Sequence, residues 1–470
     1  MPISFRRRTA GQIALLAAGT VLTMACSSRA KPPASAPSPQ PRAGAVAARP
    51  ASAGPEFDSA KLYTQMGFLS AGPPTPFVGA ISYLATTTPD STDVTLGLSL
   101  ANATLTFTRD NDRFVAGYTA GIIIRQGGVV VRDIDAHETV RVAGYKETSR
   151  IDESVVFQQG VVLAPGQYAL AVSVRDEGSG RTSTQEMLFT VPRLGASGGL
   201  STPVSFLQVT PRQSRAAVVD LITNPRATAT FGRDSAIRLY VEGYGDGERM
   251  PLTLEVRSDA GRVLWRDEAA LPRHGDLFSG VVSVPVSKVG IGVTVIAMWP
   301  TGTADTVRSP VFVTFGEGLP VAKFEDMLQY LRWFAAPYRI KALRDTVPEA
   351  RPGAWATFVK ATDSSPLTPV NEDLVDYFER LMVVTTRFRE EGTPGWMTDR
   401  GKVFLGLGEP DQVYDQGLSG FGERGRSQVW EYRGLSIQLV FYDQTGFGRW
   451  RLTNSSEMEF LSQWQRRTNR

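Results

Sequence analysis

Three carboxylates near the end of the chain are the residues best placed to do chemistry: Asp399, Glu409 and Asp411. A pair of carboxylates can serve as general acid and general base, or as nucleophile, in the hydrolysis of a glycan or a peptide. Acidic residues beside glycine and proline are also common turn residues. The sequence therefore leaves three interpretations open, an acidic catalytic or cation site, a partner-binding surface and a structural corner, and it favours the corner.

The segment around the first of these carboxylates has the composition of a turn. Gly395 and Gly401 bracket it and allow positive φ angles at either end. The run from Thr398 to Gly401 predicts a tight turn, with a small polar residue opening it and glycine closing it. Apolar alternation then predicts a strand over residues 402–407, which Pro410 and Asp411 end.

Three aromatic residues nearby suggest carbohydrate binding. Trp396, Trp430 and Tyr432 could form a platform on which a sugar ring stacks. Aromatic residues with this spacing are more often part of a core. Exposure decides between the two, because a platform must present Trp396 or Trp430 to solvent.

The region from about residue 320 to 456 resembles the GWxTD domain proteins, a bacterial family named for its Gly-Trp-x-Thr-Asp motif. The resemblance rests on a helical segment ending at Phe388, the motif itself, and a Gly-x-Pro-Asp turn. It also rests on the later run from Trp430 to Tyr432. The residues that carry it are Gly395, Trp396, Thr398, Asp399, Arg400, Gly401, Pro410, Asp411, Trp430 and Tyr432. The resemblance implies helices packed on a small sheet, with strands near 402–407, 428–432, 435–442 and 448–453, and it implies no settled activity.

The chain has few residues for metal or nucleophile chemistry. His137 and His274 are its only histidines and Cys26 its only cysteine, so the usual nitrogen and sulfur ligand sets for zinc are missing. The glycines around Phe421 are not followed by the lysine of a phosphate-binding loop. We predict no catalytic residue, no metal, no nucleotide and no cofactor.

The N-terminus has the features of an export signal followed by a lipid anchor. Residues 1–25 contain three arginines and then a short apolar run, which is typical of a signal peptide. Residues 22–26 resemble a bacterial lipobox, so we expect the lone Cys26 to carry the lipid. Ser27 stands where an inner-membrane retention signal has Asp, which favours the outer membrane. Residues 26–56 are rich in Pro, Ala and Ser and predict a disordered linker.

Net charge gives no case for nucleic-acid binding. The chain has 50 Lys and Arg against 47 Asp and Glu, and residues 1–25 contribute three arginines and no acid. Removal of the signal peptide leaves 47 of each, so the mature chain is formally neutral.

The middle of the chain predicts two immunoglobulin-like β-sandwiches, at residues 57–193 and 194–317. Short alternating strands follow one another with turns and no helices between them. Gly127 and Gly128 separate two apolar runs and predict a hairpin. Such modules in an envelope protein are expected to act as spacers or as binding surfaces.

Residues 318–470 predict an α+β domain. Apolar residues at helical spacing predict one amphipathic helix over residues 324–338. Asn371 is the expected N-cap of another helix, residues 417–426 are expected to form a mobile loop, and residues 457–470 to form a last helix. The fold class is thus mainly β, with two sandwiches before a C-terminal α+β domain.

These features favour a lipid-anchored cell-envelope protein, non-enzymatic, that contacts other proteins through its sandwiches and its GWxTD-type domain. We expect it on the outer membrane, facing the periplasm or the cell surface, attached through the N-terminal lipid and bound to a protein partner. The alternatives are a hydrolase that uses the carboxylates near the motif and a carbohydrate-binding module.

Overall fold

The computed structural model describes residues 59–148, 154–195, 199–230, 234–289, 291–314, 323–367, 371–417 and 425–469. The predicted signal peptide, Cys26 and the linker lie outside these residues, and so do residues 418–424 of the predicted loop. Among the described residues, no helix combines the length and the apolar character needed to cross a bilayer.

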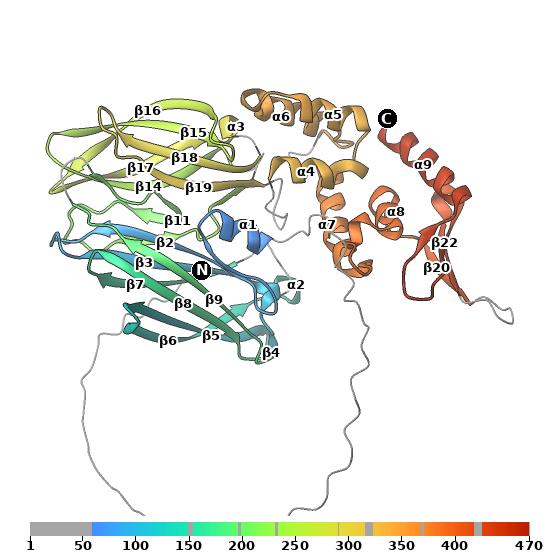
Figure 1. Cartoon of the computed structure of the whole chain (residues 1–470), viewed down its shortest axis with the longest axis horizontal. Helices are drawn as coiled ribbons and strands as arrows, with labels where there is room; N and C mark the ends of the chain where they lie inside the picture. Colours follow the sequence, from blue (N-terminus) through green and yellow to red (C-terminus); the bar gives the residue numbers. More distant parts are fainter. Residues whose placement is uncertain are drawn as a thin grey trace, which may run out of the picture. The chain divides into compact units, whose positions relative to one another are not determined.

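The first module is a sandwich of two antiparallel sheets (Figure 1). One sheet has the order β1 (Leu69–Ala71), β2 (Phe77–Ala85), β3 (Thr92–Ala101), β7 (Ser154–Leu163). The other contains β4 (Thr108–Asp110), β5 (Arg113–Gln126), β6 (Val129–Val142), β8 (Gly166–Asp176) and β9 (Thr182–Val191), with β6 and β8 on either side of β5. The short helices are α1 (Ser59–Gln65), η1 (Asn102–Thr104) and α2 (Tyr145–Thr148).

Alternation builds these sheets. Every second residue of β5 from Ala116 to Ile124 is buried between the layers, as the period of a half-buried strand requires. The hairpin between β5 and β6 forms at the predicted place, and Gly127 and Gly128 both have positive φ (55° and 86°). Tyr168 at the start of β8 donates its hydroxyl to the carbonyl oxygen of Ala164 at 2.9 Å, which is the tyrosine corner of immunoglobulin-like domains.

The second module repeats this strand order. Strands β11, β14 and β17 form one layer, and β16, β15, β18 and β19 form the other, as β2-β3-β7 and β6-β5-β8-β9 do in the first module. Strand β16 passes from one layer to the other and ends paired with β17. The strands are β10 (Gly199–Leu200), β11 (Val204–Thr210), β12 (Asp220–Thr223), β13 (Thr228–Thr230), β14 (Ala236–Tyr244), β15 (Arg249–Ser258), β16 (Val263–His274), β17 (Leu277–Pro285), β18 (Gly292–Pro300) and β19 (Val307–Thr314), with helix α3 (Val286–Val289) between β17 and β18.

The C-terminal module packs helices on a four-stranded sheet of order β20-β21-β22-β23. Its core is continuous with that of the second sandwich, since buried residues from both form one cluster. The elements are α4 (Phe324–Tyr330), η2 (Leu331–Trp333), α5 (Pro337–Asp345), η3 (Pro348–Ala350), α6 (Arg351–Ala361), α7 (Glu372–Arg387), η4 (Gly395–Met397), α8 (Asp399–Leu407), β20 (Gln412–Gly417), β21 (Arg426–Tyr432), η5 (Arg433–Leu435), β22 (Ile437–Asp443), β23 (Arg451–Leu452) and α9 (Asn454–Thr468). The predicted fold class, mainly β with a C-terminal α+β part, is confirmed.

The structure corrects the prediction for the segment after the motif. Residues 402–407 are not a strand but most of helix α8, and Thr398 to Gly401 is not a tight turn but the beginning of that helix. Every residue from Val403 to Leu407 is buried, so the apolar pattern shows no one-sided helical period. Pro410 accordingly ends no strand and lies between α8 and β20.

Some of the other predicted helices and strands are confirmed, and others are wrong or shorter than predicted. The single helix over residues 324–338 is wrong, because the chain breaks into α4, η2 and α5, and Pro337 begins α5. Asn371 caps α7 as predicted, accepting a hydrogen bond from the amide of Leu374. The strand near 428–432 and the last helix are confirmed, whereas the strand near 435–442 begins only at Ile437 and the one near 448–453 shrinks to two residues.

Candidate functional site

The two motif glycines mark places where backbone meets backbone. A Cβ atom on Gly395 would lie 1.7 Å from the carbonyl oxygen of Val384 in α7. A Cβ atom on Gly401 would lie 1.9 Å from the carbonyl oxygen of Gly395. Both distances are far inside van der Waals contact, so each position accepts only glycine. The glycines thus allow close packing rather than the positive φ angles predicted from the sequence.

Thr398 fixes the beginning of α8. Its buried hydroxyl accepts a hydrogen bond from the amide of Gly401 at 3.1 Å and donates one to the carbonyl oxygen of Gly395 at 2.8 Å. This is N-cap geometry, and it also locks the 3-10 helix η4 onto α8.

Asp399 ties α8 to the end of the chain. Its Oδ2 accepts a hydrogen bond from the amide of Leu452 in β23 at 2.8 Å. Its Oδ1 lies 3.1 Å from the Nζ of Lys402, which in turn lies 2.8 Å from Glu457 in α9. The carboxylate also stands in the first turn of α8, where the helix dipole favours a negative charge.

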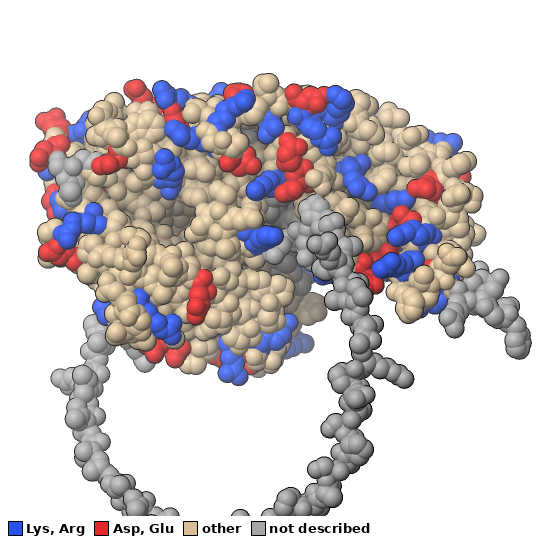
Figure 2. Space-filling model, in the orientation of Figure 1, with Lys and Arg blue, Asp and Glu red and all other residues tan. Residues whose placement is uncertain are grey.

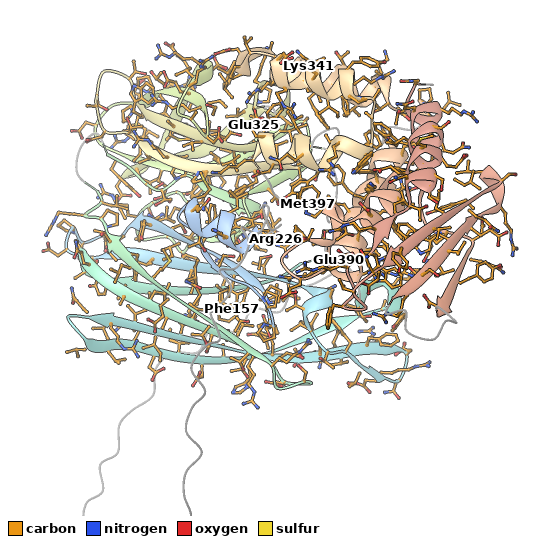
Figure 3. The ribbon with its side chains drawn as sticks, turned by 45° about the vertical axis from the view of Figure 1, so that its right-hand side comes forward. Phe157, Arg226, Glu325, Lys341, Glu390 and Met397 are labelled. Atoms are coloured by element: carbon orange, nitrogen blue, oxygen red, sulfur yellow. The ribbon has the colours of Figure 1, made fainter. Side chains whose placement is uncertain are left out.

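The aromatic residues of the motif region are core residues. Trp396 is 1% exposed and meets Tyr330 edge-on, and Trp430 is 2% exposed and packs between Phe388 and Phe441. The hydroxyl of buried Tyr432 donates to the carbonyl oxygen of Gly408 at 3.0 Å. A sugar platform requires exposed rings, so this alternative is wrong for these residues. Met397, the variable position of the motif, is the exposed one (Figure 3).

Arg400 is held between two rings. Its guanidinium carbon lies 5.4 Å from the ring centre of Phe388 and 4.9 Å from that of Trp450. Its Nε atom is buried and finds no hydrogen-bond partner among the described residues. Burial lowers the pKa of Arg400, and the nearby charge of Glu390 offsets part of that effect.

Two buried acids near Arg400, Glu390 and Asp443, are not among the site residues that the sequence predicts. Glu390 (Figure 3) accepts a hydrogen bond from the amide of Trp450 at 3.0 Å, and burial raises its pKa. Burial would also raise the pKa of Asp443, but hydrogen bonds from Gly448, Thr445 and Gly446 outweigh it and hold that pKa below its usual range. The Asp-x-x-Gly run beginning at Asp443 is a turn signal that could have found it. No local signal marks Glu390.

The three predicted carboxylates each bind a different partner. Asp399 holds Leu452, as described above. Glu409 is exposed and pairs with Arg387 at 2.9 Å, and Asp411 accepts a hydrogen bond from the amide of Arg433 at 2.7 Å. Each carboxylate thus makes its own hydrogen bond or ion pair to a different part of the fold. This arrangement gives the acidic-site interpretation no support.

Both histidines lie in strands. His137 stands on β6, where its Nδ1 is 3.1 Å from both the hydroxyl of Thr119 and the carboxylate of Glu177. His274 is the last residue of β16. Within the described ranges, no three His, Cys, Asp or Glu side chains gather closely enough to hold a metal ion.

Comparisons with known proteins leave the family open. No family model matches the chain, and no curated protein matches it. Among solved structures, a biofilm-associated protein BSP domain is 11% identical, with 51% of this chain and 52% of that chain covered, at a TM-score of 0.17. Dimeric latent PorU from Porphyromonas gingivalis is 10% identical, with 55% of this chain and 21% of that chain covered, at a TM-score of 0.23.

Fibronectin(III)-like modules of Clostridium thermocellum CbhA are 11% identical over 50% of this chain and 87% of theirs, at a TM-score of 0.13. The chain thus spans about half of the BSP domain structure and about a fifth of the PorU structure. The fold assignment accordingly rests on the strand order and the tyrosine corner.

Proposed function

We propose that the protein is a non-enzymatic, lipid-anchored scaffold of the cell envelope that holds protein partners on a rigid pair of β-sandwiches. The β-sandwich fold is compatible with protein contacts. The anchor, the outer-membrane location and the partner are our proposals from the sequence.

The observation that carries this proposal is the buried joint between the two sandwiches. Arg212 binds Glu242 with two hydrogen bonds of 2.7 Å, and both side chains are almost fully buried. The hydroxyls of Tyr240 and Tyr244 donate to the same carboxylate at 2.7 and 2.9 Å.

This network reaches across to the first module at the end of β2. Arg212 donates to the carbonyl oxygen of Ala85 at 2.6 Å, and the amide of Ala85 donates to the hydroxyl of Tyr244 at 2.9 Å. Small apolar clusters surround it, one of which packs Leu84 on Val204, Leu221 and Tyr240.

A joint of this kind resists opening. Separating the modules would break the hydrogen bonds that Arg212 and Tyr244 make with the backbone of Ala85, and would expose apolar surface as well. Domains that close on a substrate need the opposite, a boundary that moves at low cost. The joint therefore suits a spacer or scaffold better than a hinged enzyme.

The motif region fits the same proposal. We propose that the C-terminal module is a GWxTD-type domain and that its motif is a structural corner, because Gly395, Gly401, Thr398 and Asp399 are all used in packing or hydrogen bonds. Basic and acidic side chains are interspersed over the face shown in Figure 2, which offers no basic patch for nucleic acid.

Cell fractionation tests the anchor. The wild type is expected in the outer-membrane fraction and to incorporate an alkyne fatty acid, whereas Cys26→Ser is expected to release the protein in soluble form and to lose the label. A membrane-bound, unlabelled wild type would overturn the anchor.

Crosslinking in native envelope membranes tests the scaffold. A partner polypeptide should be recovered in equal yield with wild type and with folded variants of the motif. Trp396→Ala and Asp399→Ala should reduce recovery only in proportion to their folded fraction, measured by thermal melts. Loss of the partner from a fully folded variant would make the motif itself the contact surface.

A further inference from the structure

Strand β6 is a long sheet edge that is open in the described structure. It runs from Val129 to Val142 and pairs with β5 on one side, with a register shift at Val131, and no other described strand adjoins it (Figure 1). The outer row of backbone N–H and C=O groups is therefore available to another strand.

In the second sandwich, the equivalent strand has other elements against it, including β17, with which its last two residues pair. Strand β16 holds the same place in the strand order, and helices α3 and η3 contact it. Arg262, just before β16, also pairs with Glu349 of η3 at 3.5 Å. On β6, the only comparable neighbour among the described elements is the short helix α2, which follows it directly in sequence.

The side chains of β6 are unusually charged for a strand, and they are exposed. The outer face carries every second residue from Asp133 to Arg141, namely Asp133, Asp135, His137, Thr139 and Arg141. Asp133 and Arg141 have no ion pair within the described residues, although both are exposed. Charges on an edge usually prevent pairing, but they permit it where the opposing strand matches them.

A second copy of β6 supplies such a match in one register. If two copies run antiparallel about a two-fold axis at His137, residue numbers of opposing pairs sum to 274. Asp133 then faces Arg141 of the second copy, and the symmetry repeats that pair. On the other face Ile134 meets Val140 of the second copy, and both are half-buried against the sandwich core.

The neighbouring symmetric registers fail on charge or on polarity. An axis at Ile134 sets Asp133 against Asp135, and an axis at Asp135 or Glu138 sets that residue against its own copy. An axis at Ala136 brings no opposite charges together and sets Ile134 against Glu138. Like charges directly opposite each other destabilise a strand pair.

We propose that β6 pairs with β6 of a second copy about a two-fold axis at His137, which joins two first modules into one continuous sheet. Among the registers with an axis between Ile134 and Glu138, the charge pattern of β6 favours this one. The pairing needs neither the lipid anchor nor the protein partner proposed above, so each can fail without the other.

Sedimentation equilibrium of the full chain carrying Cys26→Ser tests the proposal. The chain should dimerise, and Asp133→Arg or Arg141→Asp should each weaken the dimer at least tenfold by opposing like charges. The double variant should restore it. Glu186→Arg, a charge reversal on the exposed face of β9 at the opposite edge of the same sheet, is the matched control and should change nothing.

A chain that stays monomeric at high concentration, or a dimer that survives both single reversals, would overturn the proposal. Oxidative crosslinking then tests the register independently. In the Cys26→Ser background, His137→Cys should form an intermolecular disulfide, because opposing Cα atoms in an antiparallel pair lie about 5 Å apart. In this register Thr139 faces Asp135 of the second copy, so the two cysteines of a Thr139→Cys dimer would lie four residues apart along the strand. That separation is roughly 13 Å, and the variant should not form a disulfide. The reverse result would reject the axis at His137.

Discussion

The two sandwiches share a strand order but differ in how their surfaces are used. In the second, β16 is contacted by α3 and η3, the core runs on into the C-terminal module, and the joint to the first module is buried. In the first, β6 offers a full-length open edge within the described structure. The same fold thus provides an embedded region and an exposed one. Substitutions should therefore affect stability in the embedded region and association at the open edge.

Arg212→Ala should have the largest effect. It leaves Glu242 buried without its cation, a loss of about 3–5 kcal/mol in the free energy of unfolding. Urea denaturation measures it, and Arg193→Ala is the control. Arg193 pairs with Asp90 in an exposed ion pair, which contributes about 0–1 kcal/mol. Equal effects of the two substitutions would show that the joint does not stabilise the fold.

Gly395→Ala should destabilise the motif corner by about 3 kcal/mol, because the added methyl group overlaps the carbonyl oxygen of Val384. Gly353 in α6 is the matched control, since a Cβ atom there meets nothing within 4 Å. Gly353→Ala should stabilise the protein by about 0.5–1 kcal/mol. Thermal melts of both variants check the opposite signs.

Asp443→Asn should cost about 2 kcal/mol at neutral pH by weakening charge-assisted hydrogen bonds. The folded-state pKa of Asp443 lies below its unfolded value, so its contribution is complete above about pH 4 and is lost as the pH falls through the folded-state value. The variant should therefore lose less stability on acidification than wild type. If the free energy of unfolding fell equally with pH in both proteins, the role given to this carboxylate would be contradicted.

Thr398→Ala should cost about 1 kcal/mol through loss of the N-cap of α8. Thr398→Ser keeps the hydroxyl and should retain most of the stability. Denaturant midpoints of the two variants give the comparison, and an equal loss in both would place the effect in packing of the methyl group.

Asp133→Arg should have the smallest effect on stability, within about 0.5 kcal/mol, because the side chain is exposed. Its effect should be on association alone. A large drop in melting temperature for the monomer would mean that β6 is not the open edge described above.

The sequence predicts the local features of this fold better than the contacts that organise it. Strict alternation in β5, the glycine pair after it and the Asn371 cap are local signals, and they give the right elements. The sequence wrongly predicts a strand where helix α8 lies, because Val403 to Leu407 are all buried and lack the one-sided pattern that distinguishes a surface helix. Thr398 followed by Asp399 was the available helix-start signal.

The joint and Glu390 carry no local signal at all. Arg212 meets Glu242 thirty residues later in the chain and meets Ala85 from the other module. Glu390 meets the amide of Trp450 sixty residues later. Charged side chains of these types are exposed in most proteins, so only the fold shows that these are paired and buried.

Hydrogen exchange at the amide of Ala85 tests the rigid joint most directly, because this amide is bonded to the hydroxyl of Tyr244 across the module boundary. We predict that it exchanges only through global unfolding, with the protection of core strand amides such as that of Val172 in β8. Exchange through a much lower opening free energy, while Val172 stays protected, would show that the sandwiches separate in the native state and would contradict the rigid scaffold.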